Sequence, residues 1–282
     1  MGITGLVPVL KSIQTTRKLS DFAGQTIAVD GYIWLHRGVY HCSVELATGK
    51  ETHKYSDYFM HRVRMLRHNG AEPYIDFDGG PLPAKKGTEN ERRHKREESL
   101  ARANMLAARG KYSQVRDHYL KCVDVTPEMA YQAIKALRVE NVKCVAFLER
   151  TGAVHAILTK DSDLLLLGCK NILFKVDHAY CTVVAISRAD FASVTACDGV
   201  SLFRTKAILS GCDYLPSIPG IGLKTAAVYV RKHKTAEQKA ITREGRKRIL
   251  MGYQCFLHQP IYYPSREELV HLTDVGDDWR QK

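Results

Sequence analysis

Five aspartates scattered along the chain each follow or end an apolar segment, and carboxylates in such places can share a divalent cation. In an open, mostly parallel α/β sheet, the carboxyl ends of the strands converge on one crevice, so residues distant in sequence can meet there. Crowded carboxylates ionise together only where a strong positive charge lies among them. The predicted metal ligands are Asp30, Asp78, Asp161, Asp163 and Asp213.

Magnesium is the cation that this set of ligands favours, because it is a hard ion that binds oxygen and is often completed by substrate phosphate. Two such ions about 4 Å apart could stabilise both the attacking and the leaving oxygen of phosphodiester hydrolysis. A single aspartate is weaker evidence, since aspartates also cap helices and begin turns. The set as a whole therefore predicts metal-dependent nuclease chemistry.

The composition points to a polyanionic partner. The 282 residues include 42 Lys and Arg against 30 Asp and Glu, a net charge of +12, and such a surface attracts nucleic acid by releasing counterions. We expect no membrane partner, because no apolar segment approaches the length of a membrane span and no basic amphipathic helix stands out. The eight cysteines contain no CxxC pair, which favours reduced thiols over disulfides or a zinc site.

Alternating strand and helix patterns predict an α/β fold with a mostly parallel central sheet flanked by helices. Helix signals at 32–47 and 54–69 separate strand signals at 26–30 and 73–78, and 85–116 reads as a charged helix outside the sheet. Thr126, followed by proline and an acid, is a good helix start. Later strands are predicted at 153–159, 171–176 and 181–186, with mainly helical sequence from about 202.

The charged segment after Asp78 has two interpretations. It carries several cations interleaved with acids, so it could be a solvated helix stabilised by ion pairs such as Glu91 with Lys95. Because it follows a strand that ends at a predicted metal ligand, its cations could instead lie over the metal site. Lys85 and Arg92 would then hold the scissile phosphate and stabilise charge in the transition state.

Two further segments predict contacts with nucleic acid. In SIPGIGLKTAA, Gly220 and Gly222 would let the backbone approach a phosphate, and Lys224 adds charge at a helix N-terminus; the alternative is an ordinary glycine turn. Tyr32 and His36 lie one helical turn apart just after Asp30 and could stack on an unpaired base. For Tyr32 the alternative is a packed core tyrosine.

Seven sequence blocks resemble the structure-specific 5′ nucleases, the family of flap endonuclease and exonuclease 1, and they span nearly the whole chain in the family's order. The resemblance implies a PIN-like nuclease fold with a helical arch and a C-terminal helix-hairpin-helix region. The blocks are MGITGLVPVLK, VDGYIWLHRG, DFDGGPLPAKK, ERRHKRE, CVDVTPEMA, TKDSDLLLLGC and LSGCDYLPSIPGIGLKTA.

The resemblance also implies an activity and its cofactors. The activity would be 5′ to 3′ double-stranded DNA exonuclease with 5′-flap endonuclease activity, serving mismatch excision and end resection in the nucleus. The five aspartates would hold two Mg²⁺ ions, for which Mn²⁺ could substitute, while Lys85 and Arg92 engage the phosphate. A K⁺ ion at the hairpin turn would bridge to DNA through Ser210, Ser217 and Ile221. The expected partners are DNA with 5′ ends, nicks or flaps, and DNA-repair proteins, with the chain itself a monomer.

The same resemblance suggests four consecutive regions. They are an N-terminal nuclease region with the start of the arch (1–99), an arch connection (100–137), an internal nuclease region with the helix-hairpin-helix (138–233), and a shortened helical remainder (234–282).

One departure from the family pattern lies between Cys144 and Phe147, where the family has a strand and helix start resembling APYEADAQ with two further metal-binding acids. This chain runs NVKCVAFLERTG, shorter by about ten residues by eye. Glu149 lies beyond the gap, and Asp76 should sit about 6–7 Å deeper than Asp78, so neither is expected to replace the lost acids. A catalytically impaired DNA-binding form therefore remains an alternative, as does a ribonuclease on the related fold.

Overall fold

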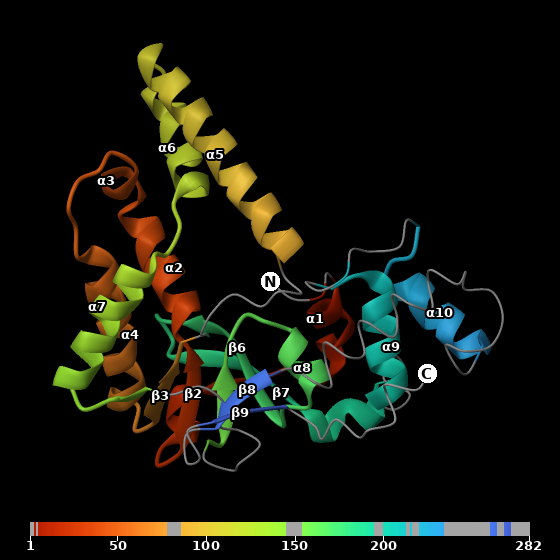
Figure 1. Cartoon of the computed structure of the whole chain (residues 1–282). Helices are drawn as coiled ribbons and strands as arrows, with labels where there is room; N and C mark the ends of the chain where they lie inside the picture. The colour runs from red at the N-terminus through yellow and green to blue at the C-terminus, as the bar shows by residue number, and fades with distance from the viewer. Residues whose placement is uncertain are drawn as a thin grey trace. The chain divides into compact units, whose positions relative to one another are not determined.

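The chain divides into two compact units that interleave along the sequence (Figure 1). One unit contains 22–145, and the other combines 1–21 with 146–282. The computed structural model describes residues 3, 5–77, 86–144, 154–194, 200–212, 215, 220–233, 260–263 and 268–271. The predicted site residues Asp78, Lys85, Asp213 and Ser217 lie outside these ranges.

The unit of residues 22–145 contains three parallel strands. Strand β3 (Glu72–Asp76) pairs with β2 (Thr26–Asp30) and with β4 (Lys143–Cys144). Ile27, Val29 and Ile75 are fully buried, as expected for β-branched side chains in a covered sheet. The strands predicted at 26–30 and 73–78 are thus confirmed within two residues. At the departure from the family pattern, β4 pairs with β3 directly before the segment that lacks the family acids.

Four helices of this unit pack on the strands or on other helices. They are α2 (Gly31–His41), α3 (Ser43–Ala47), α4 (Lys54–His68) and α7 (Pro127–Val139). Helix α4 packs against both α2 and α7 and contacts β3, while α7 contacts β4. A Cβ on Gly38 would lie 2.7 Å from the carbonyl oxygen of Tyr55, so the close approach of α2 to α4 requires glycine. The predicted start of α7 is confirmed, because the Thr126 side chain accepts a hydrogen bond from the Met129 amide.

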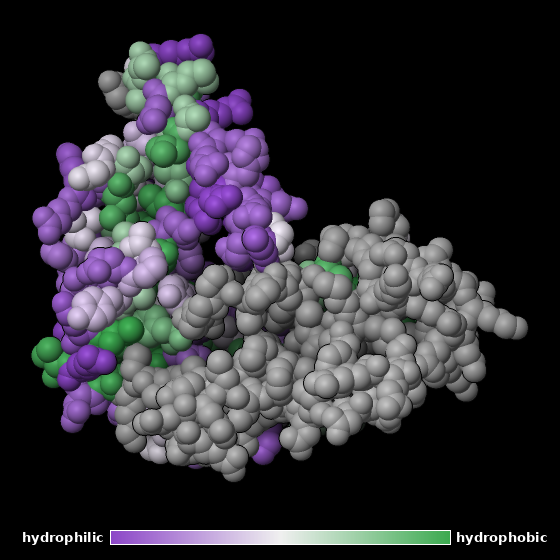
Figure 2. All heavy atoms as spheres, viewed as in Figure 1, coloured by the Kyte–Doolittle hydropathy of each residue, from purple (hydrophilic) through white to green (hydrophobic). Residues whose placement is uncertain are grey.

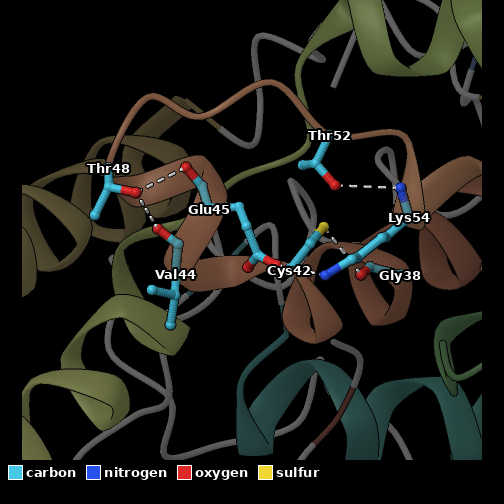
Figure 3. A network of polar contacts seen from close by, with 7 residues as sticks. All are labelled: Gly38, Cys42, Val44, Glu45, Thr48, Thr52 and Lys54. Atoms are coloured by element: carbon cyan, nitrogen blue, oxygen red, sulfur yellow. Dashed lines mark hydrogen bonds and ion pairs between the residues drawn. The ribbon is translucent and has the colours of Figure 1, made fainter.

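Polar contacts close the corner between α2, α3 and α4 (Figure 3). The Cys42 thiol donates to the carbonyl oxygen of Gly38 across 3.5 Å, and Lys54 Nζ pairs with Glu45 Oε1 at 2.6 Å. Burial raises the pKa of the Cys42 thiol, and the nearby Glu45 carboxylate adds to the effect. Burial and the Glu45 carboxylate in this corner therefore favour the protonated form of the Cys42 thiol.

A pair of long helices, α5 (Lys86–Ala108) and α6 (Tyr112–Cys122), replaces the single charged helix expected over 85–116. The break falls at Gly110, whose φ of +69° is a conformation that glycine adopts readily. The two helices share a small core of Ala103, Leu106, Val115 and Tyr119. Hydrophilic side chains dominate the flank formed by α5 in Figure 2, since most of this helix is exposed.

The second unit has a mixed strand arrangement. Strand β6 (Asn171–Asp177) is parallel to β5 (Ala156–Leu158) and antiparallel to β7 (Thr182–Ser187), and β7 also pairs with β1 (Thr15–Lys18). Strands β5, β6 and β7 confirm the strands that the sequence predicts at 153–159, 171–176 and 181–186. Strand β1 was not predicted, because all four of its residues are exposed and TTRK shows no apolar alternation.

The helices of this unit are α1 (Leu6–Val9), α8 (Asp163–Leu167), α9 (Val200–Ser210) and α10 (Leu223–His233). Short 3₁₀ helices occur at Lys11–Ile13, Leu19–Phe22 and Arg188–Ser193. The prediction of helix beyond 234 is wrong for the described residues there, because β8 (Pro260–Tyr263) and β9 (Glu268–His271) form an antiparallel pair. The run PIYY is rich in residues that favour strands. Within the described residues, no helix is long and apolar enough to cross a membrane.

Candidate active site

Asp30 is held at the junction of β2 and α2. It is the last residue of the strand and the N-cap of the helix, and its Oδ1 accepts a hydrogen bond from the Ile33 amide at 3.2 Å. In the parallel register its partner is Asp76, which ends β3. Two carboxylate residues therefore end neighbouring strands. From the sequence, Asp76 was expected only to lie deeper than Asp78, whereas the register of β2 and β3 sets it beside Asp30.

Aromatic packing fixes the start of α2 against the end of β3. A Cβ on Gly31 would lie 2.7 Å from the Phe77 ring and 2.9 Å from the Asp76 carbonyl oxygen, so only glycine permits this contact. The Tyr32 ring meets Phe77 edge-on at 5.6 Å between centroids. Tyr32 thus packs in part, as its alternative interpretation expected, yet it remains half-buried rather than fully enclosed.

Asp161 and Asp163 lie in one hydrogen-bonded turn directly after β5. The Asp161 amide donates to Thr159 Oγ1, and the Asp163 amide donates to Asp161 Oδ1, both at 3.0 Å. Asp163 is 2% exposed and begins α8. Ser162, between them, accepts a hydrogen bond from the Ile3 amide at 2.9 Å. The turn is therefore tied to the N-terminal segment and presents two carboxylates in a fixed arrangement.

The described carboxylates suit a hard cation. Asp30, Asp161 and Asp163 offer oxygen donors at strand ends, which is the donor chemistry that Mg²⁺ prefers. Asp30 belongs to one compact unit, and Asp161 and Asp163 belong to the other. No group of three or more His, Cys, Asp or Glu that could hold a metal occurs within the described residues. Asp78 and Asp213, which would complete the predicted set, are not among those residues.

On α5, three arginines form ion pairs. Arg92 Nη1 lies 2.6 Å from Glu89 Oε1 one turn earlier, with a third of the Arg92 side chain exposed. Arg93 pairs with Glu97 at 3.9 Å, and Arg96 Nη2 reaches Asp124 Oδ2 at 2.8 Å. The interpretation as an ion-paired helix therefore describes this segment well. It does not exclude a phosphate role for Arg92, because an exposed ion pair is weak.

The glycine segment after α9 has the local features that a backbone contact with phosphate needs. Gly220 is exposed with a φ of +78°, and a Cβ there would meet nothing within 4 Å. Lys224 is the second residue of α10 and is exposed. Ser210 ends α9, where its hydroxyl donates to the Ala207 carbonyl oxygen at 2.9 Å. Ile221 is half-buried, and Gly222 directly precedes α10.

Buried cations are the feature that sequence reasoning missed. Lys206 on α9 is 2% exposed, and it lines a cavity of about 300 Å³ together with Lys224 and apolar residues of α1, α9 and α10. Arg62 on α4 is 7% exposed. Both lie in helical patterns whose spacing does not distinguish a buried cation from a surface one.

Family models place the chain among known nucleases. The XPG N-terminal domain matches residues 1–99, and the XPG I-region matches residues 140–213. The chain is 31% identical to DNA damage-inducible protein DIN7 of Saccharomyces cerevisiae over 302 residues, which cover 98% of this chain and 70% of that protein. The chain belongs to the XPG nuclease family. The match to the I-region includes the segment of the departure after Cys144.

The relatives by sequence are mainly exonucleases. Identity is 38% to Exodeoxyribonuclease 1 of Schizosaccharomyces pombe, covering 97% of this chain and 52% of that protein. It is 40% to Exonuclease 1 of Arabidopsis thaliana, covering 99% of this chain and 41% of that protein. This XPG family member is therefore Exonuclease 1-like, and it spans about half the length of these relatives.

Solved structures confirm the fold. The catalytic core of Rad2 in complex with DNA substrate superposes with a TM-score of 0.69 at 15% identity, covering 95% of this chain and 90% of that one. Flap endonuclease-1 from Methanococcus jannaschii gives a TM-score of 0.57 at 19% identity, covering 88% of this chain and 83% of that one. The predicted nuclease fold, with its sheet and flanking helices, is thus correct for this XPG family member.

Proposed function

We propose that this XPG family chain is a metal-dependent 5′ to 3′ double-stranded DNA exonuclease that also cleaves 5′ flaps. The observation that carries the proposal is the turn after β5, which fixes Asp161 and Asp163 through their own backbone amides. Exonuclease 1 relatives that match nearly the whole chain support it.

The proposed cofactor is a pair of Mg²⁺ ions, with Mn²⁺ as a substitute. Asp30, Asp78, Asp161, Asp163 and Asp213 would hold them, and the bound ions would supply electrostatic stabilisation of charge on the phosphate. The backbone hydrogen bonds to Asp30 and Asp161 keep these carboxylates in place without a ligand. That preorganisation lowers the cost of assembling a site of like charges.

The other predicted residues would bind and orient DNA. Arg92 would exchange Glu89 for a phosphate oxygen and act with Lys85 on the scissile phosphate, while Tyr32 and His36 contact bases or phosphate from α2. Gly220, Gly222 and Lys224 would hold the duplex backbone as a helix-hairpin-helix. A K⁺ ion bound by Ser210, Ser217 and Ile221 would bridge to a phosphate there. Positioning of this kind can supply a large part of a hydrolytic rate.

The proposed substrates, partners and role in the cell follow from the proposed nuclease activity. The substrates would be DNA with 5′ ends, nicks or flaps, with a role in mismatch excision and end resection in the nucleus. DNA-repair proteins would be its partners, and the chain would act as a monomer. The net charge of +12 supports association with DNA.

The test of the activity is release of labelled nucleotides from the 5′ end of a duplex with recessed 5′ ends, with and without Mg²⁺. Asp161→Asn should lower the cleavage rate by about a hundredfold to a thousandfold, the range found when one catalytic electrostatic group is lost, and leave DNA binding nearly unchanged. Asp190→Asn is the matched control, because Asp190 is exposed in the 3₁₀ helix Arg188–Ser193. Equal cleavage by Asp161→Asn and the parent chain would refute the assignment.

A matched RNA duplex separates the DNA activity from ribonuclease activity. The proposal expects cleavage of the DNA and little cleavage of the RNA. Faster release from RNA would favour the ribonuclease alternative instead.

A second candidate function is DNA binding without turnover. It is favoured by the departure after Cys144, where the sequence has no counterpart of the two family acids. Salt-sensitive DNA binding with no Mg²⁺-dependent product would support it.

A further inference from the structure

Arg62 is a buried guanidinium without a carboxylate partner among the described residues. It lies in the middle of α4, is 7% exposed, and forms no ion pair in that part of the chain. Its Nη2 donates to the Tyr58 hydroxyl at 2.9 Å, and its Nη1 lies 4.0 Å from the sulfur of Met65. Its Nε has no hydrogen-bond partner within the described residues. A buried charge in this state is costly unless an anion balances it.

The surroundings of Arg62 raise that cost. Burial lowers the pKa of Arg62, and the positive charge of Arg37 on the facing helix lowers it further, against the opposing effect of the Tyr58 hydroxyl. Helices α2 and α4 pack side by side (Figure 1), and Arg37 forms no ion pair in the described part of the chain. The Arg37 guanidinium therefore adds to the positive potential around the buried Arg62.

Two aromatic rings lie next to Arg62. The Arg62 Cζ lies 4.6 Å from the centre of the Tyr58 ring, and the centroid of the His41 ring lies 5.0 Å from that of Tyr58. Tyr58 is half-buried and His41 is exposed. The Tyr58 hydroxyl accepts a hydrogen bond from Nη2, so its own proton is available to donate to an anion that binds at the guanidinium.

We infer that Arg37, Tyr58 and Arg62 form a phosphate-binding site in which a phosphodiester of a DNA strand accepts hydrogen bonds from the Arg62 guanidinium. The forked donors of arginine suit a phosphate better than a single ammonium would. The choice of DNA as the ligand rests on the proposed function. His36, a predicted DNA contact, lies on α2 one residue before Arg37.

The first experiment measures DNA affinity without Mg²⁺ over a series of KCl concentrations. It uses the full chain and a fluorescent duplex with recessed 5′ ends. Arg62→Met keeps much of the side-chain volume and removes the charge. It should weaken binding about tenfold at low salt and reduce the slope of log K against log salt by about one, the change expected for one lost phosphate contact.

Arg64→Met is the matched control. Arg64 lies two residues along the same helix, its side chain is 63% exposed, and it already pairs with Glu140. The charge change is the same, so the control should keep the slope of the parent chain. An unchanged slope in Arg62→Met, or equal changes in the two variants, would overturn the inference.

Thermal unfolding separates a binding role from a structural one. If Arg62 is held ready for an anion, Arg62→Met should unfold at a temperature no lower than the parent, because an unbalanced buried charge is removed. A lower unfolding temperature with an unchanged salt slope would show a purely structural arginine. If Arg62→Met does not fold, Arg37→Met decides by the same salt slope, since Arg37 is only half-buried.

Inorganic phosphate tests the source of the anion. At equal ionic strength, phosphate should raise the unfolding temperature of the parent more than chloride does, and it should lose this effect in Arg62→Met. A phosphate effect with no change in the DNA salt slope would assign the site to a free anion and overturn the DNA contact. Because these measurements need no Mg²⁺, a chain that binds DNA without cleaving it refutes the proposed activity alone.

Discussion

Helices α2 and α5 each follow a predicted metal ligand in the sequence, Asp30 or Asp78, but their positions are fixed by different forces. On α2, Ile33, Trp34 and Leu35 are buried, and Gly31 and Gly38 allow close backbone contacts. On α5, only Ala103 and Leu106 are buried, and ion pairs occupy much of the rest. Packing therefore holds the side chains of α2 in place, whereas those of α5 can exchange partners at little cost.

The difference suggests a division of roles. Carboxylates that must stay together against their own repulsion need rigid support, and Asp30 has it at the start of α2. Cations that capture a mobile phosphate can lie on an exposed helix, because their ion pairs are worth about 0–1 kcal/mol each and are readily replaced.

The largest effect that this comparison predicts is a loss of cleavage rate when a cation of α5 is removed. Arg92→Ala should reduce the cleavage rate by about a hundredfold, the scale of losing one group that stabilises transition-state charge, with little change in unfolding temperature. Arg93→Ala, on the same helix and also ion-paired, is the control and should change the rate only slightly. Single-turnover cleavage at saturating enzyme measures both. Equal losses in the two variants would mean that α5 supplies only general positive charge.

A smaller effect is expected on stability through α2. In Gly38→Ala the new Cβ would lie 2.7 Å from the Tyr55 carbonyl oxygen, and such overpacking should cost about 1–3 kcal/mol of unfolding free energy. Gly87→Ala on α5 is the matched control, because a Cβ there meets nothing within 4 Å. It should be neutral or stabilising by up to about 1 kcal/mol, since alanine favours helix. Urea unfolding of both variants measures this difference, and similar losses would contradict the contrast between the helices.

The sequence predicted those strands and helices whose apolar residues follow a single regular spacing. The apolar run ending at Asp30 and the start signal at Thr126 each gave an element whose bounds the structure confirms. Strand β1 was not predicted, because its residues are exposed and it pairs with β7, which lies more than 160 residues later in the chain. Local periodicity carries no information about such a partner.

The candidate site was predictable in its types of residue but not in its details. Strand-end aspartates can be read from the sequence, and the turn that joins Asp161 to Asp163 supports that reading. The register that sets Asp76 beside Asp30 depends on how β2 and β3 align, which their sequences alone do not specify. Arg62 was missed because burial of a cation depends on the tertiary contact between α2 and α4.

The most direct test of the central claim compares Mg²⁺-dependent release of 5′-terminal nucleotides by this chain and by a variant into which the APYEADAQ-like segment is inserted after Cys144. Circular dichroism should first establish that both proteins are folded. We predict Mg²⁺-dependent release by both, because the strand-end aspartates, supported by backbone hydrogen bonds, suffice to assemble the site. Release only by the variant with the insertion would contradict this account and make the present chain a DNA-binding form of the nuclease.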